Sequence, residues 1–417
     1  MRIGSLNLSS TSRAPDQTRA HGSLPRPKDV TDCFQRQPAR LSPHQIDILS
    51  RKVFVMVPGF CAKLAYEYLD AHQEVCHALG ARTFVADVGH LETSMNNARS
   101  LRAHIERATT SDDSIILIPH SNGGHATLAM LVEAAEDPDS RDSGDLLERV
   151  VGVLALNPAI QGSEVASFGG PRLGAVTGSL LGRLRANREV VAEMSIESRV
   201  GYLQRHRDGV ADVVRCLPFV SISTSYRWPR SPLDVTALAL LPTNLLVRVG
   251  WGHRNDGVLS EDSQRVPGAP YIHINGVDHI ATVMGNGASD LMHRGLGVLV
   301  DLMPPELQAR GRPPPQASRD PDVNTAEDVI TRVRLALDRS GNLQQARVLA
   351  NRALGDYVLS AGLLAAALGT SVPLLFTGVP AVCLGVSAWK ATLANARACT
   401  ATYHLVSALR EAHAIVV

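Results

Sequence analysis

The sequence has little lysine and no regular cysteine pattern. Only four of its 41 basic residues are lysine, and 40 acidic residues bring the net charge to +1. Because nucleic-acid binding depends on an excess of positive charge, no nucleic-acid partner is expected. The six cysteines form no C-x-x-C pair, which argues against a disulfide framework or a zinc site. A single bridge between Cys61 and Cys76 stays open.

The N-terminus lacks the features of a secretory signal peptide. No charged start is followed by an apolar stretch and a cleavage site of small residues. Residues 1–44 are instead rich in Ser, Thr, Arg, Pro and Gln, without an apolar period. This composition predicts a disordered leader.

Short apolar runs alternate with amphipathic stretches from Arg51 onward. With 417 residues, of which 45% are hydrophobic, the chain is long enough to bury a sizeable core. The alternation predicts an α/β fold whose mostly parallel sheet has helices on both faces. Helices are expected at about 62–79, 94–108 and 123–136. The expected strands are Val53–Val57, Thr83–Asp87, Ser114–Ile118, Val150–Leu156, Leu245–Val249 and Tyr271–Ile274.

Composition also divides the chain into regions. A catalytic domain is expected over residues 45–303, and its α/β rhythm is interrupted from about 163 to 240, which suggests a cap inserted over the sheet. Proline-rich sequence at 304–324 predicts a linker. A helical region is expected over 325–417.

An apolar segment lies within this last region. Residues 357–389 contain no Asp, Glu, Lys or Arg over thirty-three positions. Since about 20 apolar residues span a bilayer, the segment predicts membrane association, either as one tilted helix or as a hairpin broken at Pro373 and Pro380. A helix pair packed inside the protein stays open as the alternative.

The strongest chemical signal is the sequence around Ser121. The apolar run of residues 115–118 leads into Pro119-His120-Ser121-Asn122-Gly123-Gly124, and helix-compatible sequence follows. A nucleophilic serine in this context lies at the tip of a strained turn, where larger neighbours would collide with the adjacent strand and helix. Gly123 meets this requirement. Pro119 stands where the usual G-x-S-x-G pattern has its first glycine.

A serine nucleophile needs a base and an acid that orients the base, and candidates for both follow along the chain. Asp256 lies in a loop after an apolar run, and His279 follows a short predicted strand. The order serine, acid, histidine is the one found in this strand–turn–helix context. We therefore expect Ser121 to attack a carbonyl, His279 to transfer the proton and Asp256 to orient the imidazole. The alternative acids are Asp234, Asp262 and Asp278, and the alternative bases are His253 and His273.

The negative charge that develops on the attacked carbonyl oxygen needs fixed hydrogen-bond donors. One expected donor is the backbone N–H of Asn122, directly after the serine. The other is the N–H of Phe60, because Pro58-Gly59 after the first strand lets the backbone approach closely.

With these residues in view, the chain resembles α/β-hydrolase-fold lipases and esterases, and bacterial triacylglycerol lipases most of all. The resemblance covers roughly residues 50–300. The matching segments are Val57-Pro58-Gly59-Phe60, similar to the H-G-F oxyanion loop, Pro119–Gly124, similar to G-H-S-x-G-G, Asn157–Glu164, similar to T-P-H-R-G-S-E, Asn255–Ser260, similar to N-D-G-L-V-S, and the histidine segment Asp278–Ile280.

The resemblance implies an α/β-hydrolase fold with a cap and an enzyme that hydrolyses carboxylic esters with apolar acyl chains, without a cofactor. Related lipases often bind calcium through an aspartate two residues after the catalytic histidine, but Ala281 occupies that place, so no metal site is expected. An acyltransferase or thioesterase would use the same three residues. Because Pro58 and Pro119 depart from the pattern, a degenerate scaffold that only binds its ligand stays open.

The expected location combines the leader and the apolar segment. A membrane-associated bacterial enzyme would find lipid esters concentrated at the surface that holds it. A polar leader, a folded enzyme and an apolar tail are also similar to bacterial effector proteins delivered into host cells. Secretion into a host therefore stays open beside the simpler membrane-associated esterase.

Overall fold

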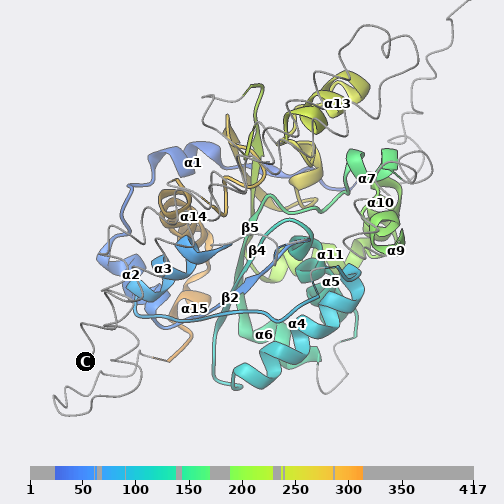
Figure 1. The fold of residues 1–417 in the computed structure, drawn as a ribbon. Helices are drawn as coiled ribbons and strands as arrows, with labels where there is room; N and C mark the ends of the chain where they lie inside the picture. Colours follow the sequence, from blue (N-terminus) through green and yellow to red (C-terminus); the bar gives the residue numbers. More distant parts are fainter. Residues whose placement is uncertain are drawn as a thin grey trace, which may run out of the picture.

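Figure 1 shows a computed structural model of the chain. The structure describes residues 24–60, 62, 68–89, 91–137, 143–169, 188–228, 236–237, 240–284 and 287–312. Its centre is a seven-stranded sheet with the order β1-β7-β6-β5-β4-β2-β3, in which every pair is parallel. The strands are β1 Lys28–Asp29, β2 Val53–Val57, β3 Arg82–Val85, β4 Ile115–Pro119, β5 Val150–Leu156, β6 Phe219–Ser225 and β7 Pro270–Asn275.

Helices cover both faces of this sheet (Figure 1). On one face lie α1 Thr31–Arg36, α2 Pro43–Ser50, α3 Asp70–Ala78, α14 Ala288–Leu302 and α15 Pro305–Ala309. On the other lie α4 Ser94–Ala108, α5 Asn122–Glu136, α6 Ser143–Arg149, α10 Ile196–Arg205 and α11 Arg207–Cys216. The remaining helices are α7 Glu164–Gly169, α9 Arg188–Glu193, α13 Leu241–Trp251 and the short 3₁₀ helix η4 Asp262–Gln264.

The central strands are buried on both faces, as a parallel sheet requires. All residues of β2, β4 and β5 are buried. Successive side chains alternate between the faces, so Phe54 and Met56 pack with α3 and α14, whereas Val55 and Val57 pack with α4 and α5. The predicted α/β class with a mostly parallel sheet is confirmed.

One predicted strand is a helix in the structure, and one strand of the structure was not predicted. Residues 245–249 belong to helix α13, where Val249 is 83% exposed and Gly252 ends the helix with φ 73°. A short apolar run does not distinguish a strand from a helix, and the prediction was wrong here. β6 lies instead at Phe219–Ser225, where the serines and threonine of a buried strand concealed it.

The position of β6 also corrects the extent of the predicted cap. The interval 163–240 contains a strand that pairs with both β5 and β7 and therefore belongs to the sheet. Helices α7, α9 and α10 precede β6, and α10 and α11 pack on the sheet with α5. The interval therefore supplies a strand and packed helices to the main domain, and only part of it could form a cap.

The folded domain begins earlier than the predicted leader allows. β1 pairs with β7, and α1 contacts α14. Helix α2 starts with a capping box in which Ser42 and Gln45 exchange hydrogen bonds. Residues 28–44 therefore belong to the domain, and their polar composition hid this because only a few apolar side chains anchor them.

The C-terminal predictions fall mostly outside the described residues. Helix α15 lies inside the predicted linker and packs Leu307 into the core, so residues 305–309 are not a linker. Residues 313–324 of the linker and the region 325–417, with its apolar segment 357–389, are not described. Among the residues that are, no helix has the length and hydrophobicity needed to span a bilayer.

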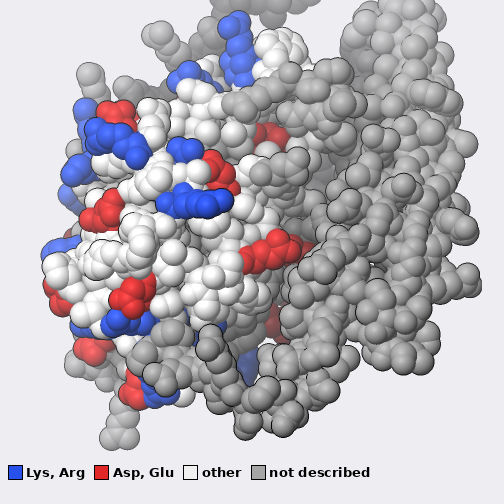
Figure 2. All heavy atoms as spheres, turned by 90° about the vertical axis from the view of Figure 1, so that its left-hand side faces the viewer, with Lys and Arg blue, Asp and Glu red and all other residues white. Residues whose placement is uncertain are grey.

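The described surface carries both signs of charge. On the face shown in Figure 2, basic and acidic side chains alternate without a patch of one sign. This agrees with the net charge of +1. On the buried side of α3, Cys76 is a free thiol, and burial raises its pKa.

Lys52 fastens the end of the domain to the start of β2. Its side chain is buried, and its ammonium group donates to the carbonyl oxygens of Leu307 at 2.9 Å and Gln308 at 3.0 Å, and to that of Arg310. The carbonyl groups at a helix C-terminus lack partners within the helix and favour a nearby positive charge. Lys52 therefore holds α15 against the sheet.

Replacing Lys52 by methionine should lower the free energy of unfolding by about 1–3 kcal/mol, because buried carbonyl oxygens lose their donor. Urea unfolding measures this change. The matched control is Lys28→Met at an exposed position of β1, which should change the free energy by less than about 0.5 kcal/mol. Equal effects of the two substitutions would contradict the role of Lys52.

Candidate active site

Ser121 lies at a sharp turn between β4 and α5. It has φ 53° and ψ −125°, a backbone conformation that a residue with a side chain adopts only under strain. The second and third residues after it must be glycine. A Cβ atom on Gly123 would lie 2.5 Å from the Val57 carbonyl oxygen, and one on Gly124 would lie 2.3 Å from the Cβ atom of Pro158. The turn therefore exists because helix, strand and loop approach each other closely.

The structure brings Ser121, His279 and Asp256 into one hydrogen-bonded chain. His279 Nε2 lies 2.9 Å from Ser121 Oγ, and His279 Nδ1 lies 2.7 Å from Asp256 Oδ2. The three residues follow β4, β7 and β6, so they meet at the carboxyl edge of the sheet, where parallel α/β folds place their sites. The imidazole and the carboxylate are buried, with only 6% and 0% of these residues exposed.

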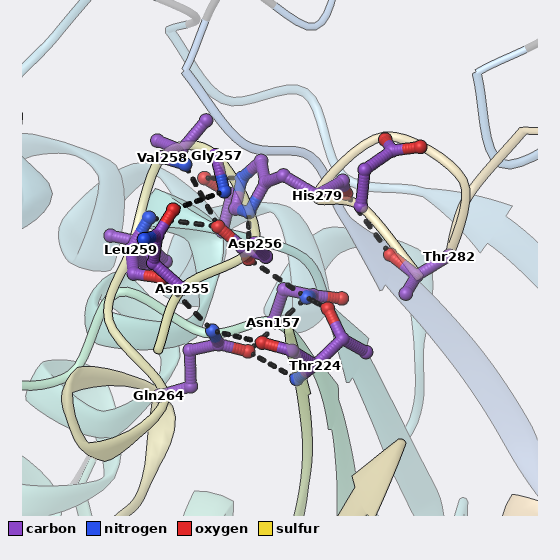
Figure 3. A network of polar contacts seen from close by, with 12 residues as sticks. Asn157, Thr224, Asn255, Asp256, Gly257, Val258, Leu259, Gln264, His279 and Thr282 are labelled. Atoms are coloured by element: carbon purple, nitrogen blue, oxygen red, sulfur yellow. Dashed lines mark hydrogen bonds and ion pairs between the residues drawn. The ribbon is translucent and has the colours of Figure 1, made fainter. Parts of the chain in front are cut away.

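The Asp256 carboxylate accepts four hydrogen bonds (Figure 3). Its Oδ1 atom accepts the backbone N–H groups of Val258 at 2.9 Å and Leu259 at 2.8 Å. Its Oδ2 atom accepts Asn157 Nδ2 at 2.9 Å, besides His279. An ionised carboxylate only accepts, so His279 Nδ1 carries a hydrogen and Nε2 presents its lone pair to the serine hydroxyl.

Asn157, which orients Asp256, was not recognised as a site residue from the sequence. It follows β5 with φ 42°, and its side-chain amide also donates to Gln264 at 3.2 Å and to the Thr224 hydroxyl. Gln264 in turn accepts the Thr224 N–H at 2.8 Å (Figure 3). The available signal was its place directly after a buried strand, at the edge where the serine and the acid were expected.

Of the two expected oxyanion donors, one is the residue after Ser121 and the other belongs to the loop that packs against it. Asn122 is the first residue of α5, where a backbone N–H has no partner within the helix. The loop of Phe60 is held close by Gly59, since a Cβ atom there would lie 2.8 Å from the Ser121 Cβ atom. Only glycine permits this approach of the loop to the serine.

The Asn122 side chain is held by a buried arginine from α10. Arg199 donates to Asn122 Oδ1 at 2.7 Å and to Ser94 Oγ at 2.7 Å, and Ser94 Oγ donates to Asn122 Oδ1 at 2.9 Å. Burial lowers the pKa of Arg199 to about 10. The nearest carboxylate is Glu193, 3.6 Å away. The region predicted as a cap thus contributes a residue that fixes the sharp turn at Ser121, which we call the elbow.

A second chain of hydrogen bonds joins the oxyanion loop, the elbow and the histidine loop. The Gly59 N–H donates to Tyr68 Oη at 2.9 Å, and Tyr68 Oη lies 2.5 Å from His120 Nδ1. His120 Nε2 lies 3.1 Å from the His279 carbonyl oxygen, which only accepts. Burial holds the pKa of His120 well below its usual range, so the ring is neutral. Nε2 therefore donates to the carbonyl, and Nδ1 accepts the tyrosine hydroxyl.

The alternative acids lie elsewhere or are engaged differently. Asp262 is exposed and pairs with an arginine of the same turn. The Asp278 carboxylate accepts the Thr236 hydroxyl at 2.9 Å and backbone N–H groups of its own loop. Asp234 lies outside the described residues. Asp256 is the candidate that the structure places against an imidazole.

The alternative bases are also placed away from Ser121. His253 Nδ1 lies 3.1 Å from Glu164, and His273 Nε2 lies 3.1 Å from Asn275 Oδ1. His279 is the candidate in contact with the serine. At the calcium position considered above, the Ala281 N–H donates to a carboxylate at 3.1 Å. Within the described part of the chain, no cluster of three His, Cys, Asp or Glu residues could hold a metal ion.

The fold and the site together define an α/β-hydrolase fold. A parallel sheet carries a serine at a strained strand-to-helix turn, with a helix following immediately. An acid and a histidine then follow in that chain order after two further strands, as this fold arranges them. The predicted fold is therefore confirmed by strand order and connectivity.

Comparisons with known proteins identify similar structures. A metagenomic carboxyl esterase is 18% identical, with 63% of this chain and 78% of that chain covered and a TM-score of 0.48. A lipase from Bacillus licheniformis is 16% identical, with coverage of 57% and 88% and a TM-score of 0.45. A phospholipase from Legionella pneumophila is 13% identical, with coverage of 62% and 62% and a TM-score of 0.43. No protein-family profile and no curated protein sequence matches this chain.

Replacing Asn157 by alanine should lower the free energy of unfolding by about 1–3 kcal/mol, because the buried Asp256 carboxylate loses a donor. Glycine adopts a positive φ without strain, so Asn157→Gly removes only the side-chain hydrogen bonds. It should show most of the decrease in the free energy of unfolding that Asn157→Ala shows. The control is Asn96→Ala, which removes an exposed amide–carboxylate hydrogen bond of 3.2 Å and should cost less than about 0.5 kcal/mol. If urea unfolding showed Asn157→Gly to be neutral, backbone strain and not the hydrogen bond would explain the alanine effect.

Stability should fall in mild acid because of buried neutral histidines. Burial lowers the pKa of His72 to about 4, although its hydrogen bond of 2.8 Å to the Thr282 carbonyl oxygen opposes this shift. The unfolded chain, with a histidine pKa near 6.5, takes up the proton first. The free energy of unfolding should therefore decrease by about 3 kcal/mol through this group as the pH falls from about 6.5 to about 4.

Urea unfolding at several pH values tests this expectation. His72→Gln keeps an N–H donor but cannot be protonated, so it should show a smaller loss of stability over the same range. Burial also lowers the pKa values of His120 and His125. The His72→Gln variant should therefore keep part of the pH dependence of its stability. Identical pH profiles for His72→Gln and the wild type would rule out His72 as a contributor.

Proposed function

We propose that the protein is a serine hydrolase of carboxylic esters. The observation that carries this proposal is the chain of hydrogen bonds from Ser121 through His279 to Asp256, at the carboxyl edge of the sheet. A serine hydroxyl is a weak nucleophile unless a base removes its proton during attack. His279 is within reach to do this, and a buried carboxylate faces its other ring nitrogen.

The proposed reaction has two halves. Ser121 Oγ attacks the ester carbonyl carbon while His279 Nε2 takes the hydroxyl proton, and the imidazolium then gives that proton to the leaving alcohol oxygen. The products of this half are the acyl-enzyme and a free alcohol. A water molecule next attacks the acyl carbon while His279 takes its proton; the bond from the acyl carbon to Ser121 Oγ then breaks, the carboxylic acid leaves, and His279 returns the proton to Ser121 Oγ. Asp256 stabilises the imidazolium throughout.

Stabilisation of the oxyanion is assigned to backbone donors. We assign this role to the N–H groups of Asn122, directly after the serine, and of Phe60, in the loop that packs against it, because fixed donors act without the reorganisation that water would need. The buried Arg199 holds the Asn122 side chain, and Gly59 lets the loop of Phe60 pack closely against Ser121. These contacts support a site that is organised before the substrate binds.

We propose lipid esters at a membrane as the substrates. Support comes from the resemblance of the sequence to bacterial lipases and from the apolar segment 357–389, which lies outside the described residues. A membrane-held enzyme would meet its substrate at the surface where it is concentrated. Membrane association in a bacterium, or in a host cell after secretion, is part of this proposal.

A fluorophosphonate probe tests the nucleophile. It should label the wild type and not Ser121→Ala, whose turnover of a short-chain p-nitrophenyl ester should be lower by a factor of about 10⁶. Asp256→Asn should lower turnover by about 10⁴, because the backbone N–H groups of the acid loop keep the amide oxygen and its NH2 group then imposes the wrong tautomer on the imidazole. Ser111→Ala, at an exposed serine, serves as the control and should behave as the wild type. Absence of labelling in a folded wild-type protein would favour a scaffold that only binds its ligand.

A competing acceptor separates hydrolysis from acyl transfer. Both reactions pass through the same acyl-enzyme, and they differ in whether water or an alcohol or thiol receives the acyl group. Added alcohol acceptors should divert little of the product if hydrolysis is the activity. Predominant transfer to the acceptor in water would assign an acyltransferase.

A further inference from the structure

A basic cavity lies beside the site, at the carboxyl ends of β6 and β7. It has a volume of about 480 Å³, and its walls include Arg227, Arg248, Arg254, Tyr226 and Trp228. We call it the arginine pocket. Its volume is within the range of small-molecule sites, about 300–1,000 Å³. Trp228 is 58% exposed, which makes it the largest apolar side chain left open at this edge.

The positive charge of the arginine pocket is poorly compensated. None of the residues that line the cavity is acidic. Among the described residues, Arg227 and Arg248 form no ion pair, and Arg254 lies 3.8 Å from Glu261, which is bound more closely by Arg265. Within the described part of the chain, three guanidinium groups therefore share one cavity without a neutralising carboxylate of their own.

Arg248 is held in place but keeps free donors. Its Nη2 atom donates to the Tyr226 carbonyl oxygen at 3.0 Å, which fixes the guanidinium beside the last turn of α13. Its Nε atom is buried without a partner within the described structure. A buried unpaired donor is unfavourable unless a ligand satisfies it.

These features fit a phosphate group better than a carboxylate. A cleft lined by one sign of charge concentrates ions of the opposite sign, and arginine forks match the oxygens of phosphate in pairs. A phosphate monoester brings about two negative charges and three acceptor oxygens to three guanidinium groups. A carboxylate brings one charge and two oxygens.

The arginine pocket lies within reach of the serine. Ser225 and Gly276, at the ends of β6 and β7, form part of its lining. β6 is two strands from β4, which carries Ser121, and adjacent strands are about 4.8 Å apart, so the lateral separation is about 10 Å. Tyr226 and Trp228 offer aromatic surface for the carbon part of a head group.

We propose that the arginine pocket binds the phosphate group of a phosphorylated ester, whose acyl carbonyl reaches Ser121. The part that concerns the acyl group rests on the proposed ester hydrolysis, whereas phosphate binding does not. The phosphate is carried either by the head group of an anionic lipid or by a soluble phosphate ester. The experiment below separates the two sources.

Binding is measured by calorimetry on the full-length Ser121→Ala protein, which cannot consume its ligand. The probes are glycerol 3-phosphate and vesicles of phosphatidylcholine with or without phosphatidic acid. The double variant Arg227→Gln/Arg254→Gln, added to Ser121→Ala, should weaken binding at least about tenfold. The control, Arg99→Gln/Arg107→Gln, removes equal charge from exposed positions of α4 and should leave binding unchanged.

The vesicles assign the source of the phosphate. Preference for vesicles with phosphatidic acid, lost in the pocket variant and retained in the control, assigns a lipid head group. Saturable binding of glycerol 3-phosphate without vesicle preference assigns a soluble phosphate ester. Equal binding by the pocket variant and the α4 control, or no binding of any probe, overturns the proposal.

Kinetics on the Ser121-containing enzyme separate this proposal from the hydrolase proposal. For esters with the same acyl chain, the pocket variant should raise KM about tenfold for the phosphorylated ester and leave the neutral ester unchanged. Phosphate binding without hydrolysis of either ester would remove the proposed function and keep the pocket. Normal hydrolysis with an unchanged KM in the pocket variant would remove the pocket and keep the function.

Discussion

The buried carboxylate of Asp256 is the charge around which this edge of the sheet is organised. A buried ion is tolerated only when its oxygens are hydrogen-bonded. Two backbone N–H groups, the Asn157 amide and His279 Nδ1 provide these bonds. The requirement fixes the loop after α13, the strained end of β5 and the loop after β7 in one arrangement. As a result, the imidazole of His279 is already oriented toward the Ser121 hydroxyl.

The elbow depends on close packing in the same way that the acid depends on hydrogen bonds. Gly123 and Gly124 allow α5 to approach β2 and the loop after β5, and Gly59 allows the oxyanion loop to reach Ser121. His120, between the strand and the serine, ties these loops together through Tyr68 and the His279 carbonyl. Close packing and hydrogen bonds thus hold the turn at Ser121, the oxyanion loop and the histidine loop together. Such surrounding contacts maintain the strained backbone of the turn.

Several elements could be predicted because their signals are local. β5 and α4 have the bounds that apolar pattern alone indicated. β6 could not be found in this way, since a strand covered on both faces needs no polar alternation and its serines and threonine are satisfied by neighbours. α13 was mistaken for a strand because five apolar-rich residues fit either period. Residues 28–44 were missed because pairing with β7, at the opposite end of the domain, orders them.

The sequence by itself determined the α/β class and the residues competent for nucleophilic chemistry, because strand hydrophobicity, paired glycines and chain order are properties of neighbouring positions. Only the tertiary structure decided which acid and which histidine meet the serine, since Asp256 and Asp278 are chemically alike and differ in what surrounds them. It also revealed Asn157, Arg199 and the arginine pocket. Their partners come from strands and helices far apart in the chain, and no local pattern records such contacts.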